Sequence, residues 1–282
     1  MTALPDIRPI DVPRLHRELA GAAAVLARTI PHGGGRDAEF ARAAVAALHD
    51  RRQFADLFLA TREMTRVAVD AARDVPPMLA TEAQPSFDGA VFFSGGLPEV
   101  DLLDRGVGLH PEALTWTRAE GVPVISLWAR DKPMGGAWVP ACTVEIIDPH
   151  LPTDPDSFEN PRYASAAALA LATWHLMAMP TLAQQREVGP PGAKGRGAPR
   201  RDIDRRVKVV DLRRLARDAT SEGSTDPKGR IYRHRWIVRG HWRQQPVGEG
   251  QKGRRTQWVE SHIKGPPGAP LLGSETVFVW RR

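Results

Sequence analysis

The chain has one cysteine and no long apolar run, and these absences set the first limits on its function. Only Cys142 among the 282 residues is a cysteine, so no disulfide can form within the chain. That usage fits a reducing compartment. No stretch reaches the roughly 18 apolar residues that a membrane-spanning helix needs. The segment from Met1 to Asp6 lacks the basic and apolar parts of a secretory signal. We therefore expect a cytoplasmic protein that does not contact membranes.

Recognisable spacings for a metal or a cofactor are also lacking. No group of His, Cys and carboxylate residues has the spacing of a zinc site. Asp202 and Asp204 form a carboxylate pair, but they lie among arginines with which they can pair, which disfavours a two-metal nuclease. Cys142 lies in an apolar segment typical of an inert core thiol. We predict no metal site and no cofactor.

Charge is divided unevenly along the sequence. Residues 191–282 hold 22 Lys+Arg against 9 Asp+Glu, a net of +13, whereas residues 1–190 hold 17 against 24, a net of −7. An acidic body joined to a basic tail indicates that the two parts have different functions, and that the basic part, residues 191–282, binds a polyanion. Heavy use of Ala, Arg, Pro and Gly is typical of a high-GC bacterial genome, phage or plasmid.

Periodicity predicts an α+β protein. Apolar residues at a three-four spacing predict helices over 12–30, 37–50 and 53–74, and a largely apolar helix over 162–187. A short helix is expected at 111–114. Apolar segments predict strands at 90–93, 122–128, 138–147 and 207–210. The resulting domains are a helical bundle or arm at 1–80, a mixed β unit with a closing helix at 81–187, a basic linker at 188–202 and a small antiparallel β-sheet domain at 203–282.

Residues 231–243 carry the most informative pattern. In a strand, side chains alternate between two faces. Tyr232, His234, Trp236, Val238 and Trp242 then share one face, whereas the other face carries, besides Ile237, a nearly continuous set of cations: Arg233, Arg235, Arg239, His241 and Arg243. Guanidinium groups arranged in this way favour phosphate as a partner. The sequence therefore predicts binding of RNA or DNA.

A second predicted strand, 256–264, can extend this cationic site. Trp258, Glu260, His262 and Lys264 share one of its faces. If that face lies beside the Arg/His face, His241 and His262 could serve as base and acid in metal-independent RNA cleavage, because histidine titrates near neutral pH. A toxin-like ribonuclease is thus one alternative to plain binding. A protein-interaction module that docks an acidic partner is another.

Two further features could contact nucleic acid. Trp242 and Trp258 lie beside glycine-rich segments and could stack on bases, although a small sheet also needs large side chains for its core. The loop at 248–255 contains Arg254 and Arg255 and could surround a phosphate. It lacks the Gly-Lys-Ser/Thr spacing of a P-loop, and a solvated hairpin loop explains it equally well.

The same region resembles a known C-terminal module. The segments are Val238-Arg239-Gly240-His241-Trp242-Arg243, then Gly253-Arg254-Arg255, then Trp258, then His262-Ile263-Lys264-Gly265-Pro266. This pattern, which covers about 30 residues, resembles a C-terminal module of bacterial proteins without established activity, many from actinobacteria, plasmids or phages. The resemblance implies a mobile-element or defence context and no particular chemistry.

Overall fold

The protein consists of two compact units, Met1–Arg213 and Arg214–Arg282. The computed structural model describes residues 4–30, 36–101, 108–119, 122–131, 135–146, 151–189, 206–213, 234–266 and 269–270. Both helices and sheets are present, and the α+β class expected from the sequence is confirmed. None of the helices within these ranges is long and apolar enough to cross a membrane.

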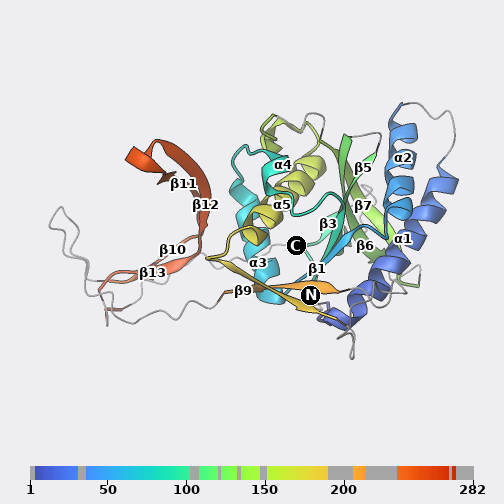
Figure 1. Cartoon of the computed structure of the whole chain (residues 1–282). Coiled ribbons are helices and arrows are strands. Elements are labelled where there is room, and N and C mark those ends of the chain that lie inside the picture. The colour runs from blue at the N-terminus through green and yellow to red at the C-terminus, as the bar shows by residue number, and fades with distance from the viewer. Residues whose placement is uncertain are drawn as a thin grey trace, which may run out of the picture. The chain divides into compact units, whose positions relative to one another are not determined.

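A mixed seven-stranded sheet forms the centre of the first unit (Figure 1). Its order is β7-β6-β5-β2-β1-β9-β8. β1 lies parallel to both β2 and β9, and the remaining neighbours are antiparallel. The strands are β1 (Asp56–Ala60), β2 (Gly89–Phe93), β5 (Pro111–Ala119), β6 (Val122–Asp131), β7 (Ala137–Glu145), β8 (Ala183–Val188) and β9 (Val207–Leu212). A separate short pair joins β3 (Val100–Asp101) to β4 (Gly108–Leu109).

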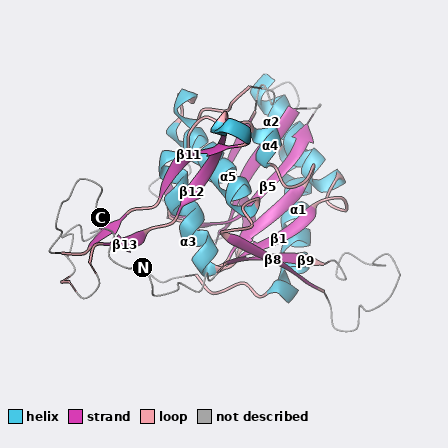
Figure 2. Ribbon diagram, turned by 60° about the vertical axis from the view of Figure 1, so that its left-hand side comes forward, coloured by secondary structure: helices cyan, strands magenta, loops and turns pink. Residues whose placement is uncertain are grey.

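Helices cover both faces of this sheet (Figure 2). α1 (Val12–Thr29) and α2 (Arg36–Asp50) pack with Leu57, Leu59 and Phe92 on one face. On the other face lie α3 (Arg62–Ala71) and α5 (Pro161–Met177), with the four-residue α4 (Ala80–Ala83) beside α5. Strand side chains alternate, so Phe58 points away from Leu57 and Leu59, and it packs on Trp116 at 5.9 Å between ring centroids. Trp116 in turn meets Trp174 of α5 at 5.5 Å.

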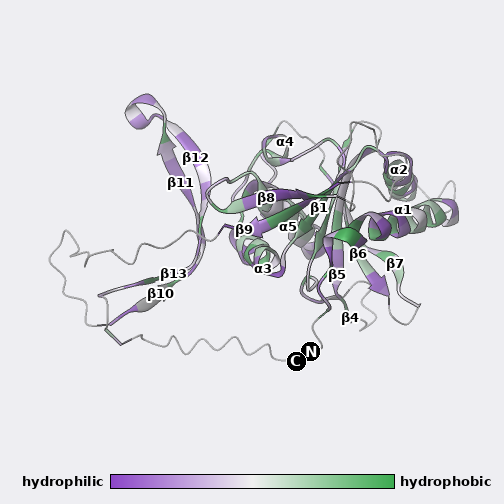
Figure 3. Ribbon diagram, turned by 60° about the horizontal axis from the view of Figure 1, so that its bottom comes forward, coloured by the Kyte–Doolittle hydropathy of each residue, from purple (hydrophilic) through white to green (hydrophobic). Residues whose placement is uncertain are grey.

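The second unit contains two antiparallel strand pairs. β10 (Trp236–Val238) pairs with β13 (His262–Lys264), and β11 (His241–Val247) pairs with β12 (Gly253–Val259). Figure 3 shows β11 and β12 mainly in the white and purple of neutral and hydrophilic residues. Among the described residues these strands form two separate pairs and do not join into the single small antiparallel sheet expected over 203–282.

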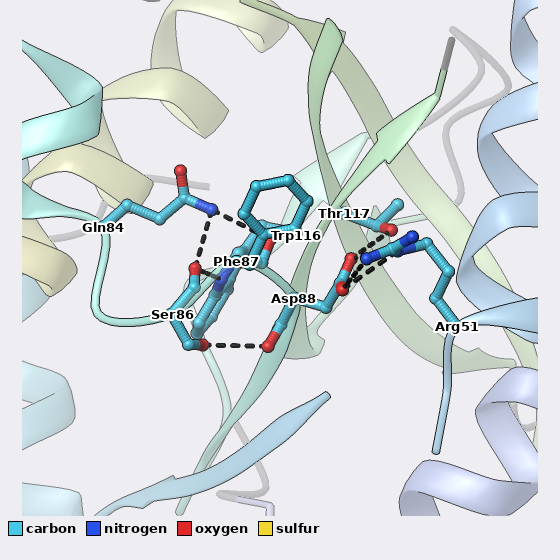
Figure 4. Close-up of polar contacts among 7 residues, drawn as sticks. All are labelled: Arg51, Gln84, Ser86, Phe87, Asp88, Trp116 and Thr117. Carbon is cyan, nitrogen blue, oxygen red and sulfur yellow. Dashed lines mark hydrogen bonds and ion pairs between the residues drawn. The ribbon is translucent and has the colours of Figure 1, made fainter. Parts of the chain in front are cut away.

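A buried carboxylate fastens the end of α2 to the sheet of the first unit (Figure 4). Asp88 is 4% exposed and accepts three hydrogen bonds of 2.7–2.9 Å from the Arg51 guanidinium. The Thr117 hydroxyl donates a fourth, of 2.8 Å. Burial of a charge is costly unless it is paired and hydrogen-bonded, and here the carboxylate oxygens are well supplied with donors. The hydrogen bonds to Asp88 also raise the pKa of Arg51, so the guanidinium keeps its positive charge.

Four segments differ from the sequence-based expectation. The helix expected over 53–74 is two elements, β1 and α3, with Thr61 between them. The expected helix at 111–114 is the start of β5, and the helix expected over 162–187 ends at Met177, ahead of β8. β9, expected in the basic domain, pairs with β1 and β8 of the first unit. Short buried strands and buried helices share an apolar composition, and pairing partners far apart in sequence decide between them.

The division into units also differs from the predicted domains. Residues 1–80 and 81–187 do not form separate bodies, because β1 and β2 are neighbours in one sheet. The basic linker expected at 188–202 lies almost entirely outside the described residues, as do Asp202 and Asp204. The boundary falls at Arg213/Arg214 because β9 completes the sheet of the first unit.

Candidate nucleic-acid interface

The two strand pairs of the second unit follow one register. Val238 pairs with His262, and His241 pairs with Val259. Three positions separate these pairs on each strand, so the register is the same on both sides of Arg239-Gly240 and Glu260-Ser261, where no strand pairing is assigned. We call the whole of residues 236–264 the ribbon. The single strand expected over 231–243 is therefore interrupted at Arg239-Gly240.

One face of β11 and β12 gathers cations and amides. Residues directly opposite in an antiparallel pair share a face, and every second residue along a strand belongs to it. Arg243 lies opposite Gln257, and Gln245 lies opposite Arg255. His241 precedes them on the same face. His241, Arg243 and Arg255 are exposed, and the two glutamines are partly buried. We call these five residues the cationic face.

The opposite face is built around two tryptophans. Trp242 and Trp258 are paired across the strands, with ring centroids 5.3 Å apart and planes at 62°. Trp258 is 5% exposed. Gly240 makes room for it, because a Cβ atom on residue 240 would lie 2.3 Å from the Trp258 ring. The sequence hypothesis that Trp258 stacks on bases therefore needs correction: the ring is buried against its own ribbon.

Hydrogen bonding differs between the faces. On the tryptophan face the Gln244 amide donates to the Thr256 hydroxyl at 3.0 Å. On the cationic face, within the described part of the ribbon, no hydrogen bond or ion pair engages the side chains of Arg243, Gln245, Arg255 or Gln257. Two guanidinium groups and two amides on one face thus keep their donors and acceptors for a ligand.

The other predicted binding residues are distributed around this face. Arg239 and Lys264 are exposed. Arg235 is engaged within the unit, where its Nε donates to the Ala269 carbonyl at 2.8 Å. Arg254 lies opposite Pro246, which places it on the tryptophan face, and it donates to the Gln251 carbonyl at 3.1 Å. Arg233 lies outside the described residues.

The two histidines proposed as base and acid are not brought together. His241 belongs to β11 and His262 to β13. His262 shares a face with Val238, which is three positions from His241, and an odd separation along an extended strand places side chains on opposite faces. Each ring nitrogen Nδ1 instead lies 3.1 Å from a nearby carbonyl, that of Arg239 for His241 and that of Glu260 for His262. The expected convergence of the 256–264 face with His241 is corrected by this register.

The ribbon concentrates positive charge. Residues 236–264 contain six Lys+Arg and two Asp+Glu, a net of +4. The two carboxylates, Glu249 and Glu260, lie in the hairpin loop and in the interruption, outside the cationic face. A surface potential of one sign attracts polyanions and raises their local concentration.

Sequence reasoning missed Gln245 and Gln257. Both residues are neutral, so the pattern of charges that identified their neighbours does not identify them. A signal was nevertheless available: the glycine-rich loop between β11 and β12 makes this segment a hairpin, and counting outward from that loop sets the cross-strand partners.

Comparison with known proteins assigns no family. No family model matches the chain, and no curated protein matches it. Among solved structures the chain is similar to one described as the crystal structure of AcrVA2, with a TM-score of 0.44 and 11% sequence identity. That similarity covers 93% of this chain and 88% of the other.

Proposed function

We propose that this protein binds nucleic acid through the cationic face of the ribbon. The observation that carries the proposal is the pair Arg243 and Arg255, both exposed and both on one face without a carboxylate beside them within the described ribbon. They are diagonal neighbours, roughly 7–8 Å apart with their Cβ atoms somewhat closer in such an arrangement. Guanidinium groups bind phosphate oxygens with two parallel hydrogen bonds, which suits them to a nucleic-acid backbone.

The shape of the ribbon supports the same function. A two-stranded antiparallel ribbon is a known way to enter a groove of duplex DNA. The buried Trp258 and its contact with Trp242 hold β11 and β12 together from behind. The resemblance of the 238–266 segment to a module from plasmid and phage proteins adds a mobile-element or defence context to this proposal.

The test is an electrophoretic mobility shift series with the full chain on RNA and on duplex DNA at several salt concentrations. Arg243→Glu/Arg255→Glu should weaken binding strongly and flatten the dependence of log K on log salt by about one unit per lost phosphate contact. The matched control is Arg28→Glu/Arg66→Glu, which changes the net charge equally at exposed helix positions of the first unit.

The control separates a local contact from a general charge effect. Loss of affinity in the ribbon variant alone supports the proposal. Equal loss in both variants, or no binding of RNA or DNA even at low salt, would contradict it. A chain that binds acidic proteins but neither RNA nor DNA would instead favour the alternative of a protein-interaction module.

A further inference from the structure

The cationic face carries more than charge. Its centre is two cross-strand pairs in reciprocal order, Arg243 opposite Gln257 and Gln245 opposite Arg255. A surface that bound only phosphate could use the amide N–H groups but not the amide oxygens, because phosphate oxygens accept hydrogen bonds and do not donate them. The amides therefore call for a different ligand chemistry.

Arg and Gln are among the side chains that recognise purine edges. Arg forms two hydrogen bonds with O6 and N7 of guanine, and Gln forms two with N6 and N7 of adenine. The face offers two of each in a compact group. Gln244, one residue away, is engaged with Thr256 on the tryptophan face, whereas Gln245 and Gln257 have no such partner in the described part of the unit.

We propose that the ribbon inserts this face into the major groove of duplex DNA and recognises a short sequence containing guanine and adenine. This inference rests on the proposed function and specifies its ligand. The major groove of B-form DNA, about 12 Å wide, admits a two-stranded ribbon whose strands lie about 4.8 Å apart. The deep, narrow major groove of duplex RNA does not admit side chains.

The other face supplies the rigidity that such recognition needs. Trp258 is buried beneath Gly240 and packed against Trp242, so the strands are held together behind the contact surface. Base-edge recognition requires side chains at fixed positions, and a preorganised backbone lowers the entropy lost on binding.

The experiment is selection of duplexes from a randomised DNA pool by the full chain, followed by sequencing. The wild-type chain should enrich a short motif with guanine and adenine. Gln245→Ala/Gln257→Ala should lose the preference at the adenine positions, with affinity for the selected duplex reduced by about tenfold or more. Its salt dependence should stay that of wild type, because no charge is removed.

The matched control is Gln244→Ala/Thr256→Ala, which alters the same strands on the tryptophan face. It should retain the selected motif. Near-ultraviolet circular dichroism verifies that the Trp242–Trp258 pair persists in each variant. Tight DNA binding without any enriched motif, or a motif unchanged in Gln245→Ala/Gln257→Ala, would overturn this inference and leave the proposed function standing. Absence of all nucleic-acid binding would overturn both, and preference for duplex RNA over duplex DNA would overturn the groove assignment.

Discussion

Gly240 and Trp258 lie so close that no other residue fits at position 240 without a shift: a Cβ atom there would stand 2.3 Å from Cζ2 of the indole. The Trp258 ring is 5% exposed and occupies the space that the missing side chain leaves. The glycine falls in the interruption between β10 and β11. A change at this position therefore acts on the tryptophan face without removing any group from the cationic face.

Gly240→Ala should displace the Trp258 ring and loosen the ribbon. The added methyl group overlaps ring atoms, and overpacking of this kind costs about 1–3 kcal/mol. Nuclear magnetic resonance should show shifted indole signals, and affinity for nucleic acid should fall. Gly21→Ala is the control, because a Cβ atom at residue 21 meets nothing within 4 Å and alanine favours the helix there. Unchanged indole signals in Gly240→Ala would contradict the packing of this face.

How far the sequence predicts this fold depends on the distance between pairing segments. The amphipathic spacing of 12–30 and 37–50 identified α1 and α2 closely, since a helix is defined by residues near in sequence. β1 was expected as part of a helix, and β9, correctly expected as a strand at 207–210, was placed in the wrong domain. Their pairing joins segments far apart in sequence, since Phe58 lies opposite Lys208, 150 positions later. Thr61 separates β1 from α3 in a stretch whose apolar residues also fit one continuous helix.

The site was predicted only in part, because its alternation along one strand is local in sequence whereas the pairing of its strands is not. Period-two alternation placed His241 and Arg243 together, and their strand bears this out. The hypothesis that His262 joins them was wrong in register, because partner positions in the hairpin decide which face a residue occupies. Trp258 was ambiguous from sequence, since a tryptophan suits a base platform and a core equally, and only the space at Gly240 resolves the question.

Separation of the histidines predicts that the chain does not cleave RNA by paired imidazole catalysis. His241 and His262 occupy opposite faces of the ribbon, so one cannot act as base and the other as acid on the same phosphate. Labelled RNA incubated with the full chain in EDTA should stay intact across pH 5–8. Cleavage that survives EDTA and disappears in His241→Ala would refute this expectation and restore the ribonuclease alternative.

The Asp88 network should contribute strongly to the stability of the first unit. Asp88→Ala removes the carboxylate that accepts from Arg51 and Thr117, and leaves the buried hydroxyl without its acceptor. We expect the free energy of unfolding in urea to fall by about 2–3 kcal/mol, the usual cost of losing charged hydrogen bonds at a buried site. Asp11→Ala is the control. It breaks a pair whose Arg8 side chain is 75% exposed, and such pairs contribute about 0–1 kcal/mol. Equal losses in the two variants would contradict the role assigned to Asp88.

The single thiol should be unreactive in the folded protein. Burial raises the pKa of Cys142 from 9.0 to about 11, with the positive charge of Arg162 opposing the shift, and the Sγ atom lies 3.8 Å from the Arg162 carbonyl. At pH 8 the thiolate, which is the reactive form, is then about a hundredfold rarer than in a free cysteine with a pKa of 9. Because the folded pKa is raised, the neutral thiol stabilises the fold fully below pH 9, and this contribution is lost as the pH rises toward 11. Iodoacetamide labelling at pH 8, followed by mass spectrometry, should be slow in buffer and fast in urea, and rapid labelling of the folded chain would show that the thiol is not held in an apolar setting.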